Sequence, residues 1–164
     1  MIETDKNEFI ARAQGLVDRV TGEAVVFGMM QPRLESCDPD TLSLVVSYPA
    51  LPWERNATGA VHGGMTAAMM DTAMGTLAYA ITGGITPTVS LNMSYPRPAP
   101  GDGTLLISVR AVMAGRTILC ISGEMWDGRA PEKPVVTAQG VFRNTGLTFP
   151  LDPLPDAEAA AADA

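Results

Sequence analysis

The residues best suited to chemistry in this chain lie between Asn56 and Asp71. The stretch reads Asn56-Ala-Thr-Gly-Ala-Val-His62-Gly63-Gly64, and Asp71 is the only charge in the small and apolar run that follows. Two glycines at the start of a helix leave backbone N–H groups uncovered, and such groups can stabilise a developing oxyanion. A single carboxylate among Ala, Met and Leu is costly to bury unless it has a partner or a catalytic task. The combination predicts acyl-transfer chemistry.

Two helices are expected around this motif. Apolar residues at helical spacing predict a helix over residues 4–20, with Thr4 or Asp5 as its N-cap. Residues 61–81, closed by a Gly-Gly pair, predict a second helix that is apolar almost all round. Other elements must therefore cover most of its surface.

Strand patterns account for most of the remaining chain. They lie at residues 33–37, 42–48, 87–95, 104–114, 117–127 and 135–144, separated by turn signals. One buried helix with a meander of long antiparallel strands predicts an α+β fold in which a curved sheet wraps around the helix. Such a sheet exposes an edge, and pairing with a second copy of the chain would cover it.

The domain organisation follows from these patterns. Residues 1–22 are expected to form a helix that packs on the main domain, and residues 23–144 form that domain. From residue 145 onward the chain is rich in Pro, Asp and Ala without periodicity, and a flexible tail is expected there.

Composition excludes several classes of function. The chain has 164 residues, of which 46% are hydrophobic, as expected for one domain with a substantial core. Its net charge of −7 argues against nonspecific nucleic-acid binding. Between Arg97 and Arg143, however, six basic residues stand against four acidic ones, so a polyanionic small molecule could find a local basic surface.

The cellular setting is inferred from the N-terminus and the cysteines. The first residues show neither the basic nor the apolar part of a secretory signal, so Cys37 and Cys120 are expected to stay reduced in a cytoplasm. One histidine and two scattered cysteines do not make a zinc site, and neither a metal nor a redox cofactor is expected. Residues 61–85 are long and apolar, but Asp71 near their centre favours a buried helix over a membrane span.

The spacing of the motif has a consequence for assembly. Gly63 and Asp71 are eight residues apart on one predicted helix, which separates them by roughly 12 Å along its axis. One chain cannot place both groups on a single carbonyl carbon. A two-fold dimer with antiparallel central helices would bring Asp71 of one chain to the Gly63 end of the other.

The order and spacing of these residues resemble a known family. The pattern Asn56-(five residues)-His62-Gly63-Gly64-(six residues)-Asp71, followed by a strand ending Asn92-Met-Ser-Tyr-Pro-Arg-Pro98, is similar to hotdog-fold acyl-CoA thioesterases of the phenylacetic-acid-degradation (PaaI-like) type. The likeness continues through Gly115-Arg116 and Ala138–Phe142, and covers roughly residues 25–144. It implies a hotdog fold, hydrolysis of an aryl-acyl-CoA or a short- to medium-chain acyl-CoA, a homodimer or dimer of dimers, and no cofactor.

The resemblance also implies roles for matching positions. Asp71 would be the general base that activates water, or the nucleophile, and the sequence leaves both open. The Gly63 N–H would polarise the thioester carbonyl, while Asn56 would orient the water or the carbonyl. His62 would fix the loop or form a hydrogen bond near the thioester. The family often has Ser or Thr on the next strand to hold the water, which points to Thr88.

Four residues are expected to bind substrate rather than to act on it. Ser90 is expected to share the face of Thr88 because side chains alternate along a strand. Gly64 lies beside the proposed oxyanion donor, and Arg97 and Arg116 are candidates for the coenzyme A phosphates.

Structural explanations remain open for the same residues. His62 can be structural, the glycines can permit close packing, Asp71 can be a satisfied buried carboxylate, and Asn56 can be an ordinary turn residue. Two other functions on the same fold also remain. One is an enoyl-CoA hydratase or dehydratase using His62 and Asp71, against which the phenylacetic-type spacing argues. The other is a non-catalytic acyl-CoA-binding protein, which would have no use for a water-activating carboxylate.

Overall fold

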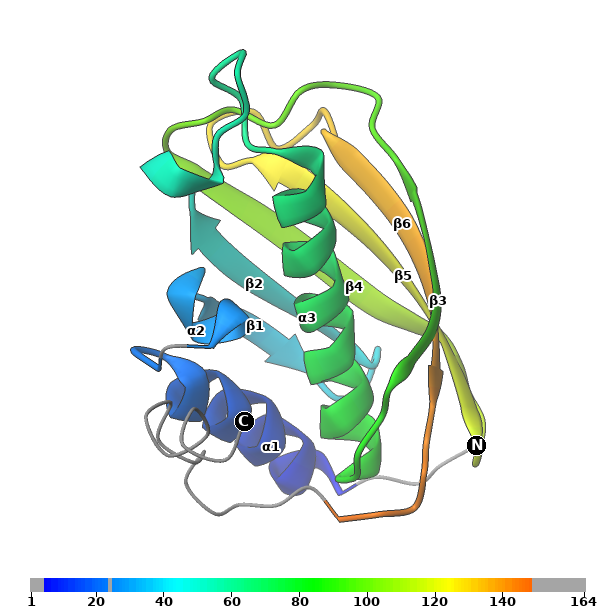
Figure 1. The fold of residues 1–164 in the computed structure, drawn as a ribbon. Helices are drawn as coiled ribbons and strands as arrows, with labels where there is room; N and C mark the ends of the chain where they lie inside the picture. The colour runs from blue at the N-terminus through cyan, green and yellow to red at the C-terminus, as the bar shows by residue number, and fades with distance from the viewer. Residues whose placement is uncertain (1–4, 24, 149–164) are drawn as a thin grey trace, which may run out of the picture.

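The computed structural model describes residues 5–23 and 25–148 (Figure 1). The two predicted helices and all six predicted strands are present. The elements in chain order are α1 (Lys6–Val20), α2 (Val26–Met29), β1 (Arg33–Asp38), β2 (Ser43–Pro49), a 3-10 turn η1 (Pro52–Glu54), α3 (Gly63–Thr82), β3 (Thr88–Ser94), β4 (Thr104–Ala114), β5 (Ile118–Asp127) and β6 (Val136–Arg143).

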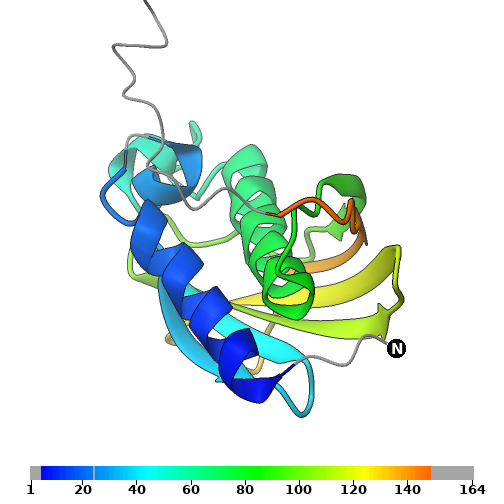
Figure 2. The ribbon, with the colours of Figure 1, turned by 90° about the horizontal axis from the view of Figure 1, so that it is seen from below.

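The strands form one sheet in the order β1-β2-β4-β5-β6-β3, and every neighbouring pair is antiparallel. The sheet curves around α3, which crosses its concave face (Figure 1). Seen from below in Figure 2, α1 lies beside α3 on the same side of the sheet. The predicted α+β architecture, a long central helix wrapped by a curved antiparallel sheet, is therefore confirmed.

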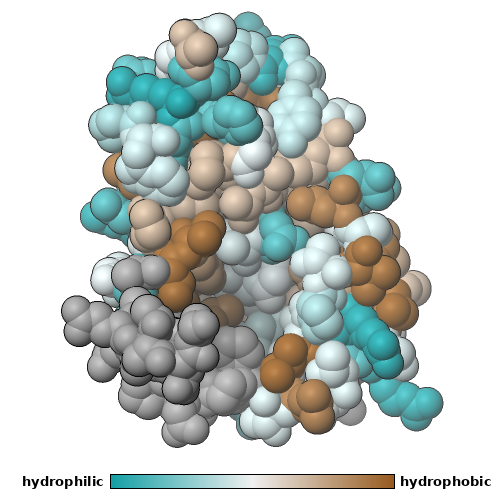
Figure 3. All heavy atoms as spheres, viewed as in Figure 1, coloured by the Kyte–Doolittle hydropathy of each residue, from teal (hydrophilic) through white to brown (hydrophobic). Residues whose placement is uncertain are grey.

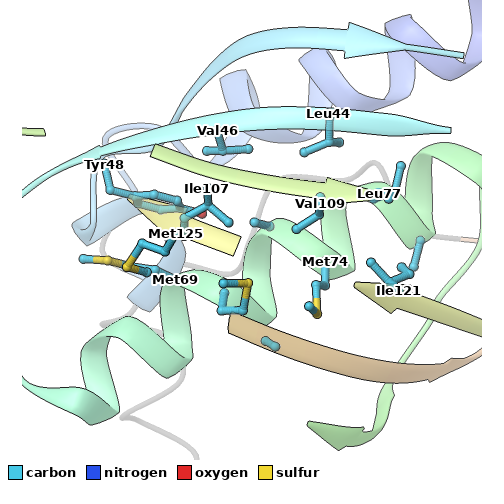
Figure 4. Close-up of a cluster of buried hydrophobic side chains, with 14 of the residues drawn as sticks. Leu44, Val46, Tyr48, Met69, Met74, Leu77, Ile107, Val109, Ile121 and Met125 are labelled. Carbon is cyan, nitrogen blue, oxygen red and sulfur yellow. The ribbon is translucent and has the colours of Figure 1, made fainter. Parts of the chain in front are cut away.

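The interface between α3 and the sheet is filled by methionines that fit over glycines. Met69, Met70 and Met74 are fully buried, as Figure 4 shows for Met69 and Met74. A Cβ added at Gly123 of β5 would lie 2.6 Å from the Met70 sulfur, and one at Gly140 of β6 would lie 2.8 Å from the Met74 sulfur. The missing side chains let the flexible methionines pack directly on the strands. This packing fixes which face of α3 turns away from the sheet.

Helix α1 is held at its start and along one face. Asp5 is its N-cap and accepts hydrogen bonds from the backbone N–H groups of Asn7 and Glu8. Its buried residues repeat at helical spacing and face α3 and β1. They are Phe9, Ala13, Val17 and Val20.

Strand β3 is an edge of the sheet that the described residues form, and among these strands it pairs only with β6. Beyond β6, the carbonyl oxygen of Leu147 accepts a 2.9 Å hydrogen bond from the Ile85 N–H. The greater part of the expected flexible tail, residues 149–164, lies outside the described residues. Within the described ranges, none of the helices combines the length and apolar character that crossing a membrane requires.

Candidate active site

The N-terminus of α3 presents one unused backbone donor. His62 is the N-cap: its Nδ1 accepts a 2.9 Å hydrogen bond from the Gly64 N–H. Its carbonyl oxygen accepts hydrogen bonds from Met65 and Thr66. Of the first four N–H groups of the helix, only that of Gly63 has no hydrogen-bond partner among the described residues. A bare N–H at the positive end of a 20-residue helix is suited to hold an oxyanion.

The glycine at position 63 leaves room beside this donor. Its backbone is not in the left-handed region, and a Cβ placed there would come no closer than 3.7 Å, to the ring of Tyr95. Nothing within the described chain therefore requires glycine at this position. At Gly64, in contrast, a Cβ would lie 3.1 Å from the capping Nδ1 of His62, so the capping ring itself explains that glycine.

Gly63 lines a hollow of about 350 Å³. Asn56, Tyr95 and Arg97 line it together with Gly63. The Asn56 Oδ1 is occupied within the loop, because it accepts hydrogen bonds from the N–H and hydroxyl of Thr58 at 2.9 and 2.7 Å. The NH₂ group of Asn56 can therefore donate a hydrogen bond to a ligand, because no described residue accepts one from it.

Asp71 lies two turns along the helix and is half-buried. Its Oδ1 accepts a 2.8 Å hydrogen bond from the hydroxyl of Thr88, the first residue of β3. Its Oδ2 has no hydrogen-bond partner in the described part of the chain. Asp71 and Thr88 line a second hollow of about 420 Å³, in which the carboxylate could act on a water molecule.

The prediction that Ser90 shares the face of Thr88 is wrong. Thr88 pairs with Phe142 and Ser90 pairs with Val141, so a β-bulge lies between them. Because Phe142 and Val141 are consecutive residues of β6, they face opposite sides of the sheet, and so do their partners. The bulge turns Thr88 toward α3 and leaves Ser90 outside the hollow that Asp71 lines.

The two candidate arginines lie at opposite ends of the sheet. Arg97 follows β3, and one of its guanidinium nitrogens donates a 2.9 Å hydrogen bond to the Pro134 carbonyl. Arg116 is exposed in the turn between β4 and β5, where its carbonyl oxygen accepts a 3.2 Å hydrogen bond from the Asn144 side chain. Within one chain the two side chains do not share a site.

One chain does not bring the Gly63 and Asp71 groups together. The Gly63 hollow holds Asn56 and Arg97, whereas the second hollow holds Asp71 and Thr88, and the two share no lining residue. No carboxylate is among the described residues that line the first hollow, and the helix N-terminus does not line the second. No group of three or more potential metal-ligating side chains was found among the residues that the structure describes.

The sequence interpretation missed a buried carboxyl at the base of the motif loop. Glu54 is 1% exposed, and its Oε2 accepts a 2.9 Å hydrogen bond from the Leu51 N–H. Its Oε1 is buried without a partner among the described residues. Burial raises the pKa of this carboxyl, because water is removed from its charged form. Its main-chain carbonyl accepts a 2.7 Å hydrogen bond from His62, so Glu54 is joined to the helix cap.

Comparisons with known proteins show the family of the chain. Residues 58–132 match the family model of the thioesterase superfamily. The phenylacetic acid degradation-related protein of Ralstonia eutropha JMP134 is 31% identical, with a TM-score of 0.67, and the match covers 77% of this chain and 98% of that one. No curated protein sequence matches significantly.

Two more distant structures share the fold. The PaaI protein of the Escherichia coli phenylacetic acid degradation operon is 17% identical, with 88% and 98% of the two chains covered and a TM-score of 0.76. A hypothetical thioesterase of Streptococcus pneumoniae TIGR4, solved with coenzyme A, is 21% identical, with 72% and 91% covered and a TM-score of 0.64. The present chain belongs to the hotdog-fold thioesterases of the phenylacetic-acid-degradation type, and is a thioester hydrolase.

Proposed function

We propose that the protein is an acyl-CoA thioesterase that releases coenzyme A and a free acid from an aryl-acyl-CoA or a short- to medium-chain acyl-CoA. The observation that carries this proposal is the pair of complementary half-sites. The Gly63 N–H is unused at a helix N-terminus, and the Asp71 carboxylate has one oxygen unused beside Thr88, as far as the described residues extend. A thioester carbonyl needs the first group, and the attacking water needs the second.

The proposed active unit is a two-fold dimer formed through β3. This strand has no partner on its outer side within the described chain, and Val89 at its bulge is 59% exposed. An unpaired edge of seven residues without proline or lysine can accept another strand. Pairing two copies of β3 antiparallel would run the sheet across both chains and would place the partner subunit's Asp71 near the Gly63 end of α3.

In the proposed reaction, Asp71 takes a proton from water as the water oxygen bonds to the thioester carbon. The carbonyl oxygen becomes an oxyanion held by the Gly63 N–H of the other chain. The carbon–sulfur bond then breaks, and the coenzyme A thiolate leaves and takes up the proton. Thr88 holds Asp71 in place, and the NH₂ of Asn56 binds the carbonyl or the water. Attack by Asp71 itself on the carbon would instead expel the thiolate and form a mixed anhydride, which water would then hydrolyse to the free acid and the Asp71 carboxylate.

The remaining candidate residues have supporting roles in this proposal. His62 fixes the helix start, and Gly64 lets its ring lie close to the backbone. The dimer would also bring Arg97 of one chain to the end of the sheet that carries Arg116 of the other, where both could meet coenzyme A phosphates. Ser90 lies on the other face of β3, so it would contact only a substrate that the partner subunit's part of the sheet holds on that face.

Other observations support coenzyme A thioesters and argue against a hydratase. The Streptococcus pneumoniae protein of the same fold was solved with coenzyme A. A hydratase that used His62 as its base would need a free ring lone pair, but Nδ1 already accepts the Gly64 N–H, and Nε2 of the neutral ring then carries the proton. No metal or redox cofactor enters the proposed reaction.

Thiol release tests the proposal directly. Phenylacetyl-, benzoyl-, butyryl-, hexanoyl- and palmitoyl-CoA would be offered to the wild type and to Asp71→Asn, which keeps the shape and loses the basicity. We expect release by the wild type and a loss of at least about a thousandfold in kcat for the variant. The exposed carboxylate Asp102 provides a matched control, and Asp102→Asn should be unaffected. Wild-type activity in Asp71→Asn would refute the mechanism.

A further inference from the structure

The hollow beside Asp71 has an apolar wall built by the N-terminal segment. Helix α1 and the segment that follows it contribute side chains here, as does the connection between α3 and β3. These side chains are Leu16, Val20, Val25, Phe27, Ile85 and Pro87. Asp71 is the only charged side chain among the described residues that line the hollow. In the orientation of Figure 1, small and apolar residues also cover much of the exposed side of α3 (Figure 3).

The floor of this hollow contains a glycine that the fold does not explain. Gly75 lies one helical turn after Asp71 on the same face of α3 and lines the same hollow. A Cβ added there would meet nothing within 4 Å. At Gly123 and Gly140, by contrast, buried methionines occupy the space of the missing side chain. A side chain added at position 75 would therefore extend into the hollow, so this glycine determines how much of the hollow stays open, whereas the equally unobstructed Gly15 of α1 does not line it.

We propose that this hollow is the acyl subsite, that it selects uncharged and largely apolar acyl groups, and that Gly75 keeps its floor open. The inference rests on the proposed thioesterase function and names its substrate class. The carbon under attack must lie at Asp71, so the acyl group extends from there into the adjoining space. Gly75 and the apolar side chains of α1 and Phe27 line that space together with Asp71.

The charge of the hollow determines which acyl groups it rejects. No lysine, arginine or histidine is among its described lining residues, and Asp71 is nearby. An acyl group ending in a carboxylate would lose hydration without gaining a cation and would be repelled by Asp71. Dicarboxylic acyl groups such as succinyl are therefore poor substrates.

A leucine at position 75 tests the subsite. Gly75→Leu should lower kcat/KM for hexanoyl- and phenylacetyl-CoA at least about tenfold and change acetyl-CoA hydrolysis less than about threefold. Gly15→Leu is the matched control, because Gly15 is also inside a helix, a Cβ added to it would also meet nothing within 4 Å, and it does not line this hollow. The control should change neither activity. The melting temperature of both variants should equal that of the wild type or exceed it by roughly 2 °C.

Binding of uncleavable thioethers separates this inference from the proposed reaction. The wild type should bind S-hexyl-CoA at least about tenfold more tightly than S-methyl-CoA, and Gly75→Leu should abolish that preference. This binding preference is expected even if the protein hydrolyses no thioester. Absence of hydrolysis would refute the proposed function and leave the proposed subsite standing. Equal binding of the two thioethers by the wild type would overturn the subsite. So would an equal loss of acetyl- and hexanoyl-CoA hydrolysis in Gly75→Leu, or succinyl-CoA hydrolysis as fast as that of hexanoyl-CoA.

Discussion

The hydroxyl of Thr88 donates a 2.8 Å hydrogen bond to Oδ1 of Asp71. The bond fixes the first residue of the edge strand β3 to the middle of α3. It depends on the bulge after Thr88, because that bulge turns the hydroxyl to the side of the sheet that carries the helix. Since Oδ2 stays unpaired within the described chain, Thr88 can orient the carboxylate without occupying it.

Removing this hydroxyl should slow the reaction without unfolding the protein. A hydrogen bond to a charged group contributes about 1.5 to 3 kcal/mol, so Thr88→Val should lower kcat roughly tenfold to hundredfold. Thr88→Ser keeps the donor and should restore most of the rate. Steady-state kinetics of the two variants, with thermal melting beside them, checks this. A slow Thr88→Ser variant would show that the methyl group matters rather than the hydrogen bond.

The fold was predictable because its signals are local. Apolar residues at helical spacing gave α1, and the apolar run after Gly63 gave α3, within two residues of the observed ends. Helix α2 was not predicted, because its four residues are too few to show a period. The order of strands and the position of β3 at an edge come from long-range pairing, which no local pattern specifies.

The candidate site was less predictable, because it also depends on contacts between residues that are distant in the chain. The family resemblance implied that Thr88 helps to hold the water, and the hydrogen bond from its hydroxyl to Asp71 was not predicted. Ser90 was placed on the wrong face, because the bulge arises from the pairing of β3 with β6. No pattern in the sequence singles out Glu54 or Gly75. Their significance lies in burial and in empty space, which depend on elements distant in the chain.

Mixed dimers should reveal whether each site uses two chains. Asp71→Asn and Gly63→Val should each be inactive, the first without its base and the second with its oxyanion donor blocked. In a mixed dimer, one of the two sites would combine the intact Asp71 of one chain with the intact Gly63 of the other. Random mixing after unfolding and refolding should therefore restore about a quarter of the wild-type activity. Activity that stays at background after mixing would place both groups of a site in one chain.

Charge on the edge strand should separate the proposed dimer. In Val89→Glu/Asn92→Glu, two exposed residues of β3 become acidic, and two such strands would repel each other across the two-fold axis. We expect a folded monomer by light scattering and circular dichroism, with activity lowered at least about a hundredfold. Val112→Glu is the control, since Val112 is 66% exposed on β4, away from the edge. A monomer that remained fully active would contradict a shared site.

The last prediction concerns Glu54, whose carboxyl pKa is raised by burial. Above the ordinary carboxyl pKa of about 4.3, the unfolded chain has lost this proton while the folded chain still holds it, so the contribution of Glu54 to stability falls as pH rises through the raised pKa. Glu54→Gln stays neutral, keeps an acceptor for the Leu51 N–H, and should gain stability over the wild type as pH rises from about 4.3 to the raised pKa, above which the gain should level off. Thermal melting from pH 4 to 8 measures this gain, with Glu23→Gln as the exposed control. A difference that does not change with pH would mean that Glu54 is not protonated in the folded protein.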